Sequence, residues 1–183
     1  RDHRKYGVTA RTTTSLATAL LGTLRAELPG SWGRRVAEAA ADVVQLLTGV
    51  MGGAAEAEPG LPYHDGTVVD HIRVTRDVSM IRLQLDHPLD YHPGQYLTVQ
   101  VPQWPRRWRY LSPSIPPADP GGGAIEFHVR SVSGGMVSTA IVGETRPGDR
   151  WRLSNPHGAL HVDRDDGDVL MVAGSTGWRR CAR

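Results

Sequence analysis

The feature that most constrains the fold is a change in hydrophobic spacing at Pro62. Before it, apolar residues recur about every four positions in residues 15–28 and 32–50, which predicts two amphipathic helices. After it, apolar and polar residues alternate, which predicts half-buried strands of an antiparallel sheet or barrel. These strands are expected at residues 81–85, 97–101 and 125–129. The fold class predicted is therefore mainly β with an α-helical N-terminal part.

Glycine and proline pairs suggest where the parts of the chain begin and end. Gly52-Gly53 and Pro59-Gly60 are expected to end the second helix, so residues 54–62 are expected to form a linker. One short helix at 136–142 is expected to interrupt the strands. A continuous apolar run at 169–173 is typical of a parallel strand buried on both faces, as in an α/β domain. We therefore expect three parts, residues 1–57, 62–165 and 166–183.

Composition narrows the class of protein. The chain has 183 residues, of which 39% are hydrophobic and 22% charged, and its net charge is +2, which is ordinary for a globular protein and gives little support for nucleic-acid binding. The single cysteine, Cys181, excludes an internal disulfide and fits a cytoplasmic location. No stretch approaches the roughly 20 apolar residues that span a bilayer, so no membrane partner is expected. The chain has no initiator methionine, and we expect it to be an internal fragment.

Three short blocks carry the chemistry. They are PGQY at 93–96, RRWRYLSPS at 106–114 and GGMVS at 134–138. An arginine fork suits a phosphate, and a serine hydroxyl can bond a ring nitrogen. Two glycines at a helix start expose backbone N–H groups that suit a diphosphate. The residues alone predict an antiparallel barrel with an anion site. The alternative is a barrel whose arginines are a solvated face, and the order of three blocks favours the binding site.

These blocks, in this order, resemble the FAD-binding barrel of the ferredoxin–NADP reductase superfamily, and most closely the reductase part of flavohaemoglobins. The resemblance implies that Arg109 holds the FAD diphosphate and that Ser112 bonds the flavin N5. Leu111 stands where the family has a tyrosine that stacks on the flavin, and strand alternation should point Tyr110 to the other face. The FAD-binding residues implied are Tyr96, Arg109, Tyr110, Leu111, Ser112, His128, Val129, Arg130, Gly134, Gly135, Met136, Val137 and Ser138.

Both ends of the chain extend the resemblance. The turn 174–177 resembles the entry to the family's nicotinamide-nucleotide domain, which implies that Gly174, Thr176 and Gly177 approach NAD(P)H. Residues 3–8 resemble the segment of the proximal haem histidine, which implies that His3 is an iron ligand and that residues 1–57 are the last part of a globin domain. The family tyrosine ten residues after that histidine is replaced by Thr13.

The resemblance implies an oxidoreductase. In the intact flavohaemoglobin, hydride passes from NAD(P)H to FAD, and single electrons pass to haem b, where dioxygen converts nitric oxide to nitrate. This chain by itself is expected to be inactive in hydride transfer. Two alternatives remain open. The barrel could serve another oxygenase or ferredoxin system, with an unrelated helical adaptor before it, or the chain could be an inactive truncated product.

Overall fold

The chain folds into two compact units, residues 1–62 and 63–183, and the boundary between them in the sequence lies where the hydrophobic spacing changes. The structure, a computed structural model, describes residues 4–7, 10–57, 59–117, 123–160, 170 and 172. Within these residues, no helix combines the length and the apolar character needed to cross a bilayer.

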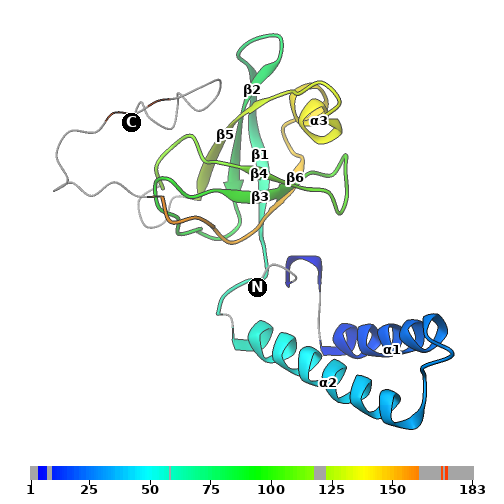
Figure 1. Cartoon of the computed structure of the whole chain (residues 1–183). Coiled ribbons are helices and arrows are strands. Elements are labelled where there is room, and N and C mark those ends of the chain that lie inside the picture. Colours follow the sequence, from blue (N-terminus) through cyan, green and yellow to red (C-terminus); the bar gives the residue numbers. More distant parts are fainter. Residues whose placement is uncertain are drawn as a thin grey trace. The chain divides into compact units, whose positions relative to one another are not determined.

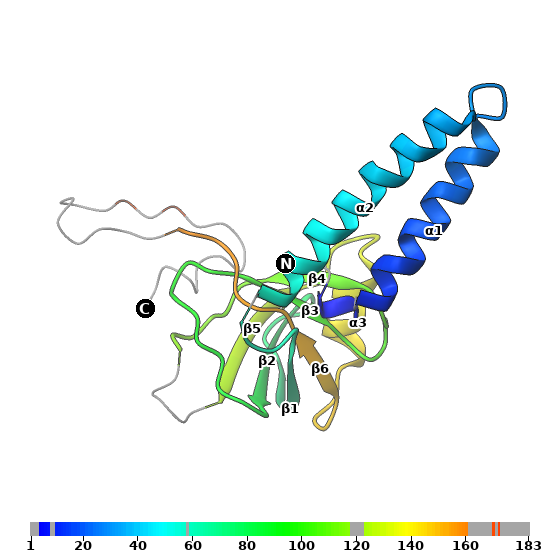
Figure 2. The same ribbon diagram turned by 90° about the horizontal axis from the view of Figure 1, so that it is seen from below.

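The first unit is a helical hairpin. A 3-10 turn, η1 (Arg4–Tyr6), precedes α1 (Ala10–Glu27) and α2 (Arg34–Ala57), and the two helices pack side by side (Figure 2). Both predicted helices are present. The prediction that Gly52-Gly53 ends the second helix was wrong, because α2 continues through both glycines to Ala57. A glycine costs a helix interior only about 1 kcal/mol relative to alanine, and the alanines and glutamate that follow are strong helix formers.

The hairpin leaves most of its apolar surface uncovered. In the described part of this unit, Val44 is the one buried apolar side chain. The two helices therefore do not close a core of their own. The large apolar side chains that remain exposed are Leu16, Leu20, Leu28, Val36, Val43, Leu46, Leu47, Val50 and Met51.

The second unit is a six-stranded antiparallel barrel that is nearly closed (Figure 1). Along the sheet the order is β4-β3-β6-β1-β2-β5. The strands are β1 (His64–Arg73), β2 (Val78–Leu85), β3 (Leu97–Gln100), β4 (Trp108–Leu111), β5 (Ala124–Arg130) and β6 (Arg150–Leu153). The two outermost strands are joined just beyond β4, where Pro113 forms an isolated bridge with Phe127 and Ser114 N donates to Glu126 O at 2.8 Å. We call this junction the seam.

Alternating side chains fill the barrel, as the sequence predicts. The predicted strands are confirmed as β2, β3 and β5, and their inward residues form one cluster. Each large apolar side chain that is fully buried contributes about 1.5–3 kcal/mol. Buried residues of this cluster are Ile81, Leu83, Leu85, Leu97, Val99, Ile125, Phe127, Val129, Trp151 and Leu153.

Helix α3 (Met136–Glu144) is the helix predicted between the strands, and it packs against β5 and β2. Its buried side chains include Val137 and Ile141. Its C-terminal end is fixed to β1, because Arg73 Nη2 donates to the carbonyl of Val142 at 2.8 Å and His71 Nδ1 donates to the carbonyl of Thr145 at 2.7 Å. Cationic and N–H donors at this end also complement the helix dipole.

The strand predicted at 169–173 is not found at the two positions described. Leu170 and Val172 lie in no strand and are 90% and 89% exposed. A strand buried on both faces needs neighbours, and these two side chains have none that cover them. The rest of this run, the turn with Gly174, Thr176 and Gly177, and His3 lie outside the described residues.

Candidate functional site

The pairing of β4 with β3 decides which side of the sheet each candidate side chain occupies. Arg109 pairs with Val99 and Tyr110 pairs with Thr98. Residues directly opposite in a ladder share a face, so Arg109 and Leu111 lie on the side of Val99 and Tyr110 lies on the other. Tyr110 therefore points away from Leu111, as strand alternation predicts.

Arg109 and Leu111 differ in what surrounds them. Leu111 is half-buried and packs against the barrel core. The guanidinium of Arg109 is exposed, donates to the carbonyl of Trp108 at 2.9 Å and pairs with no carboxylate of the described residues. Because a guanidinium carries five N–H donors, Arg109 keeps donors available for an anion.

Three aromatic rings meet beside β4. The ring of Tyr96 stands edge-on to that of Tyr110, with centroids 5.4 Å apart, and lies 5.9 Å from the ring of His157. Backbone bonds in both directions, at 2.8 and 2.9 Å, hold His157 opposite Tyr96. Tyr110 is 68% exposed, so this cluster presents an aromatic surface to a ligand ring.

His157 was not among the residues expected at the site. It lies in the segment that follows β6, where Gly158 adopts a φ of +96° and a Cβ there would lie 3.1 Å from the Tyr96 ring. The only signal in the sequence is the Asn155-Pro156-His157-Gly158 turn after a strand. Such a turn does not reveal which distant segment it contacts.

The PGQY turn is held tightly against the same segment. Gly94 has a φ of +92°, and a Cβ there would overlap the carbonyl of Leu160. Gln95 Nε2 donates to the carbonyl of Gly158 at 3.1 Å. Just before the turn, the Tyr91 hydroxyl donates to the carbonyl of Ile115 at 2.9 Å, and burial raises the pKa of Tyr91 to about 12. The turn therefore connects the segments that follow β4 and β6.

The candidate residues on β5 are engaged by protein groups. The side chain of His128 is 8% exposed and its Nε2 lies 3.3 Å from Glu126 Oε1. Val129 points into the core. Arg130 Nε donates to Asp77 Oδ2 at 2.7 Å. Val129 can therefore contact a ligand only through its backbone. A ligand that binds Arg130 would share its guanidinium with the carboxylate of Asp77.

The start of α3 carries backbone N–H donors beside two glycines. Gly134 has a φ of +76°, and a Cβ on it would meet no atom within 4 Å, so the space above it is open. A Cβ on Gly135 would lie 2.6 Å from Ser138 Oγ and 3.0 Å from Val132 O. The first N–H groups of a helix have no intrahelical acceptor and carry the positive end of the dipole.

These features fit a diphosphate at the N-terminus of α3. Only glycine fits at position 135 without displacing Ser138, and the neighbouring glycine leaves the backbone accessible. Met136 is partly exposed beside it, whereas the side chain of Val137 is buried and only its N–H can take part. Ser112 is half-buried just beyond β4, on the seam.

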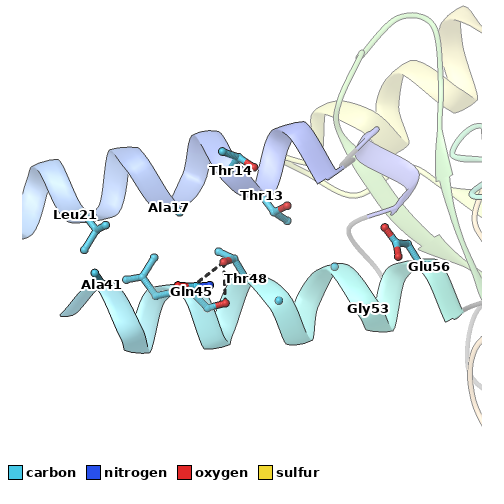
Figure 3. A pocket seen from close by; sticks show the side chains of 12 residues that line it. Thr13, Thr14, Ala17, Leu21, Ala41, Gln45, Thr48, Gly53 and Glu56 are labelled. Carbon is cyan, nitrogen blue, oxygen red and sulfur yellow. Dashed lines mark hydrogen bonds between the residues drawn. The ribbon is translucent and has the colours of Figure 1, made fainter. Parts of the chain in front are cut away.

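The helical hairpin has a groove of its own, drawn in Figure 3. It measures about 650 Å³ and lies between α1 and α2. Thr13 and Glu56 lie toward one end of it, and Thr48 Oγ1 donates to the carbonyl of Val44 at 2.8 Å. Neither imidazole nor thiolate lines this groove, and the described residues contain no cluster of metal-ligating side chains. The groove therefore gives no evidence of an iron site.

Comparison with known proteins identifies the barrel. Residues 65–162, more than half of the chain, match the family described as the oxidoreductase FAD-binding domain. The chain belongs to this family. Its FAD-binding domain is of the ferredoxin reductase type, in agreement with the fold class predicted for the barrel.

Several relatives of the FAD-binding domain belong to bacterial oxygenase systems. The phenol hydroxylase P5 protein of Acinetobacter pittii is 32% identical over 115 residues, which cover 62% of this chain and 32% of that protein. The ferredoxin–NAD(P)(+) reductase component of the naphthalene 1,2-dioxygenase/salicylate 5-hydroxylase systems of a Ralstonia species is 37% identical over 113 residues, covering 61% and 33%. The chain thus spans about a third of the length of these relatives.

Solved structures agree on the fold. The ferredoxin reductase of carbazole 1,9a-dioxygenase is 25% identical with a TM-score of 0.51, and the match covers 59% of this chain and 33% of that one. A flavohaemoglobin from Malassezia yamatoensis, solved with FAD and haem, is 16% identical with a TM-score of 0.62, and the match covers 86% and 43%. At this identity the second likeness shows the fold alone, so membership of the flavohaemoglobins is not confirmed.

Proposed function

We propose that this chain is the FAD-binding part of a reductase that passes electrons from a reduced nicotinamide nucleotide to an oxygenase partner. The observation that carries the proposal is the match of residues 65–162 to the FAD-binding family, together with relatives that are named as reductase components of oxygenase systems. This corresponds to the first alternative left open by the sequence rather than to nitric oxide dioxygenase.

The FAD diphosphate would bind between the N-terminus of α3 and Arg109. Gly134, Gly135 and Ser138 form the helix start, whose N–H groups suit a diphosphate. The guanidinium of Arg109 is exposed and not paired with a carboxylate of the described residues, so it can neutralise the second negative charge.

The flavin and adenine rings would lie against side chains from β4 and the turn before β3. The aromatic surface of Tyr96 and Tyr110 offers edge and face contacts. Leu111 offers an aliphatic contact only to a ring on the opposite face of β4. The Ser112 hydroxyl can bond a ring nitrogen. When bound, FAD supplies the change from two-electron to one-electron transfer. The protein contributes binding, orientation and the exclusion of water from the ring.

We also propose the limits of the domains. Residues 62–165 form the FAD-binding domain, and residues 166–183, with Gly174, Thr176 and Gly177, begin a nicotinamide-nucleotide domain in the intact protein. The cytoplasmic location stays a prediction.

A second candidate is a flavohaemoglobin, in which residues 1–57 end a globin domain and His3 binds haem b. One observation favours it. The FAD-binding unit, residues 63–183, is about two thirds of the chain, so the 86% match to the flavohaemoglobin structure reaches into the helical hairpin. In that protein the electrons would reach haem, and the substrates would be dioxygen and nitric oxide.

The test is to titrate the purified chain with FAD and with FMN, following flavin fluorescence. We expect FAD to bind and FMN to bind at least about tenfold more weakly, because FMN lacks the diphosphate bridge that the α3 N-terminus would hold. Failure to bind FAD contradicts the proposal. Reconstitution with haem separates the two candidates, since a Soret band that His3→Ala abolishes would favour the flavohaemoglobin.

A further inference from the structure

A buried carboxylate sits on β5 beside the seam. Glu126 is 6% exposed, and three side chains contact its two oxygens. Ser114 Oγ donates to Oε1 at 2.9 Å, Arg82 Nη2 donates to Oε2 at 2.9 Å, and His128 Nε2 lies 3.3 Å from Oε1. Arg82 also reaches Asp70 on β1, at 3.3 Å. A carboxylate without such partners would be strongly destabilising at this burial, so the contacts form one network.

This network lies where the two ends of the sheet meet. Ser114 is held to Glu126 twice, by its side chain and by its backbone N–H, which donates to the Glu126 carbonyl at 2.8 Å. Ser114 lies two residues after Ser112, and Glu126 lies two residues before His128. The same carboxylate therefore contacts the stretches that hold Ser112 and His128, both of which are candidate FAD-binding residues.

We propose that Glu126 is a positioning residue for FAD, whose carboxylate fixes the segment after β4 to β5 and so sets the spacing of Ser112 and His128. This rests on the proposed function, because those two stretches matter only if the barrel binds FAD. Glu126 acts through its neighbours, since it is buried and both of its oxygens accept hydrogen bonds from the protein.

The substitution Glu126→Gln isolates this role. A carboxylate accepts on both oxygens, whereas a carboxamide of the same size accepts on one and donates from the other side. If the amide oxygen stays on Arg82, which can only donate, the NH₂ group faces Ser114 and His128. Both would then have to turn from donor to acceptor, the serine by rotating its hydroxyl and the histidine by changing tautomer. The barrel can stay folded while the stretches that hold Ser112 and His128 are no longer held in a fixed orientation to each other.

Asp70→Asn is the matched control. It removes a carboxylate from the same arginine, but it contacts neither Ser114 nor His128 in the network. The side chains of Asp70 and Arg82 are 46% and 42% exposed, so their pair resembles a surface ion pair, which contributes little to stability. Ser114→Ala is a second probe that removes one bond to the carboxylate and leaves its charge in place.

The experiment measures the FAD dissociation constant and the visible circular dichroism of the flavin at saturating FAD, using the full chain. We expect Glu126→Gln to weaken FAD about tenfold, the size of one charged hydrogen bond, and to alter the dichroism. We expect Asp70→Asn to change the affinity by less than about threefold and to leave the dichroism as in the original chain. Melting temperatures without FAD show how far each variant affects the barrel itself.

The outcomes separate this inference from the proposed function. If the original chain binds no FAD, the proposed function fails. If it binds FAD, and Glu126→Gln has the same affinity or the same dichroism at saturation, then Glu126 supports only the fold and the inference is wrong. If Glu126→Gln does not fold, Ser114→Ala decides, because the inference requires that it too alter the dichroism.

Discussion

Replacing Gly135 by alanine tests whether the start of α3 is built for backbone donors. An added Cβ would lie 2.6 Å from Ser138 Oγ and 3.0 Å from the carbonyl of Val132. The serine hydroxyl cannot simply yield, because it donates to the carbonyl of Gly135 at 3.1 Å and accepts from the N–H of Val132 at 3.2 Å. The substitution therefore displaces Ser138 and breaks both bonds.

The magnitude follows from those two bonds. Each neutral hydrogen bond is worth about 0.5–1.5 kcal/mol, so losing two removes about 1–3 kcal/mol. The backbone at Gly135 has a φ of −85°, which alanine adopts freely. Because alanine lowers the conformational entropy of the unfolded chain, it also stabilises the folded state by about 0.4–1 kcal/mol. We expect Gly135→Ala to lower the free energy of unfolding by about 1–2 kcal/mol and to weaken FAD as well.

The assay is urea denaturation of five variants: Gly135→Ala, Ser138→Ala, the double variant of these two, Gly134→Ala, and Gly134→Ala combined with Ser138→Ala. If the displaced serine accounts for the loss, the double variant should be about as stable as Ser138→Ala alone, because the bonds are already gone. Gly134→Ala serves as the control. Its loss of about 1–2 kcal/mol comes from the positive φ and should not change when Ser138→Ala is added. Additive losses in the Gly135 and Ser138 pair would refute the reasoning.

Three further outcomes are expected. Arg109→Ala should weaken FAD binding by about 1.5–3 kcal/mol in a fluorescence titration, whereas substitution of the exposed Arg107 by alanine should not. Equal effects would mean that both arginines act through general surface charge and that Arg109 makes no specific contact. Tyr110→Leu should weaken FAD binding by about 0.5–1.5 kcal/mol and reduce the quenching of flavin fluorescence. If neither changes, the flavin ring lies on the side of Leu111 instead. Burial raises the pKa of Glu126, but hydrogen bonds from Arg82 and Ser114 outweigh it and hold the pKa below its ordinary value. This stabilisation is complete above the unfolded pKa and is lost as pH falls through the folded pKa. Glu126→Gln should therefore flatten the acid limb of stability against pH, and an unchanged limb would contradict the assignment.

Periodicity predicted most of the barrel because its strands are half-buried. β2, β3 and β5 alternate cleanly, so their inward residues could be named from the sequence. β1 was missed, and its core position Gly66 shows why. A Cβ there would lie 2.8 Å from Leu85 Cδ2, so the position must be glycine and gives no apolar signal. A bulge between Val68 and Asp70 then shifts the alternation.

The end of α2 illustrates a different failure. Gly52-Gly53 was interpreted as a helix stop, yet neither glycine adopts a positive φ and neither meets a neighbouring atom within 4 Å. A glycine ends a helix when it adopts the left-handed conformation that other residues avoid. Here the strong helix formers Ala54, Ala55 and Glu56 follow the glycine pair, and the loss of about 1 kcal/mol per glycine is not enough to stop the helix.

Some candidate site residues can be inferred from their neighbours in the sequence, whereas others depend on a contact between two distant segments. Arg109, Ser112 and the glycine pair before α3 could be named as candidates from the sequence, because each depends on the residues next to it: an arginine fork, a hydroxyl, a helix start. Glu126 and His157 were not, because their roles come from contacts with Ser114 and Tyr96, which lie 12 and 61 residues away in the chain. The expected role of Arg130 changed for the same reason, since its partner Asp77 lies just before β2, the strand paired with β5. A barrel seam is formed only when the ends of the sheet meet, so no local pattern can predict which polar groups it will bring together. The residues that the seam buries are therefore the ones for which mutation will be most informative.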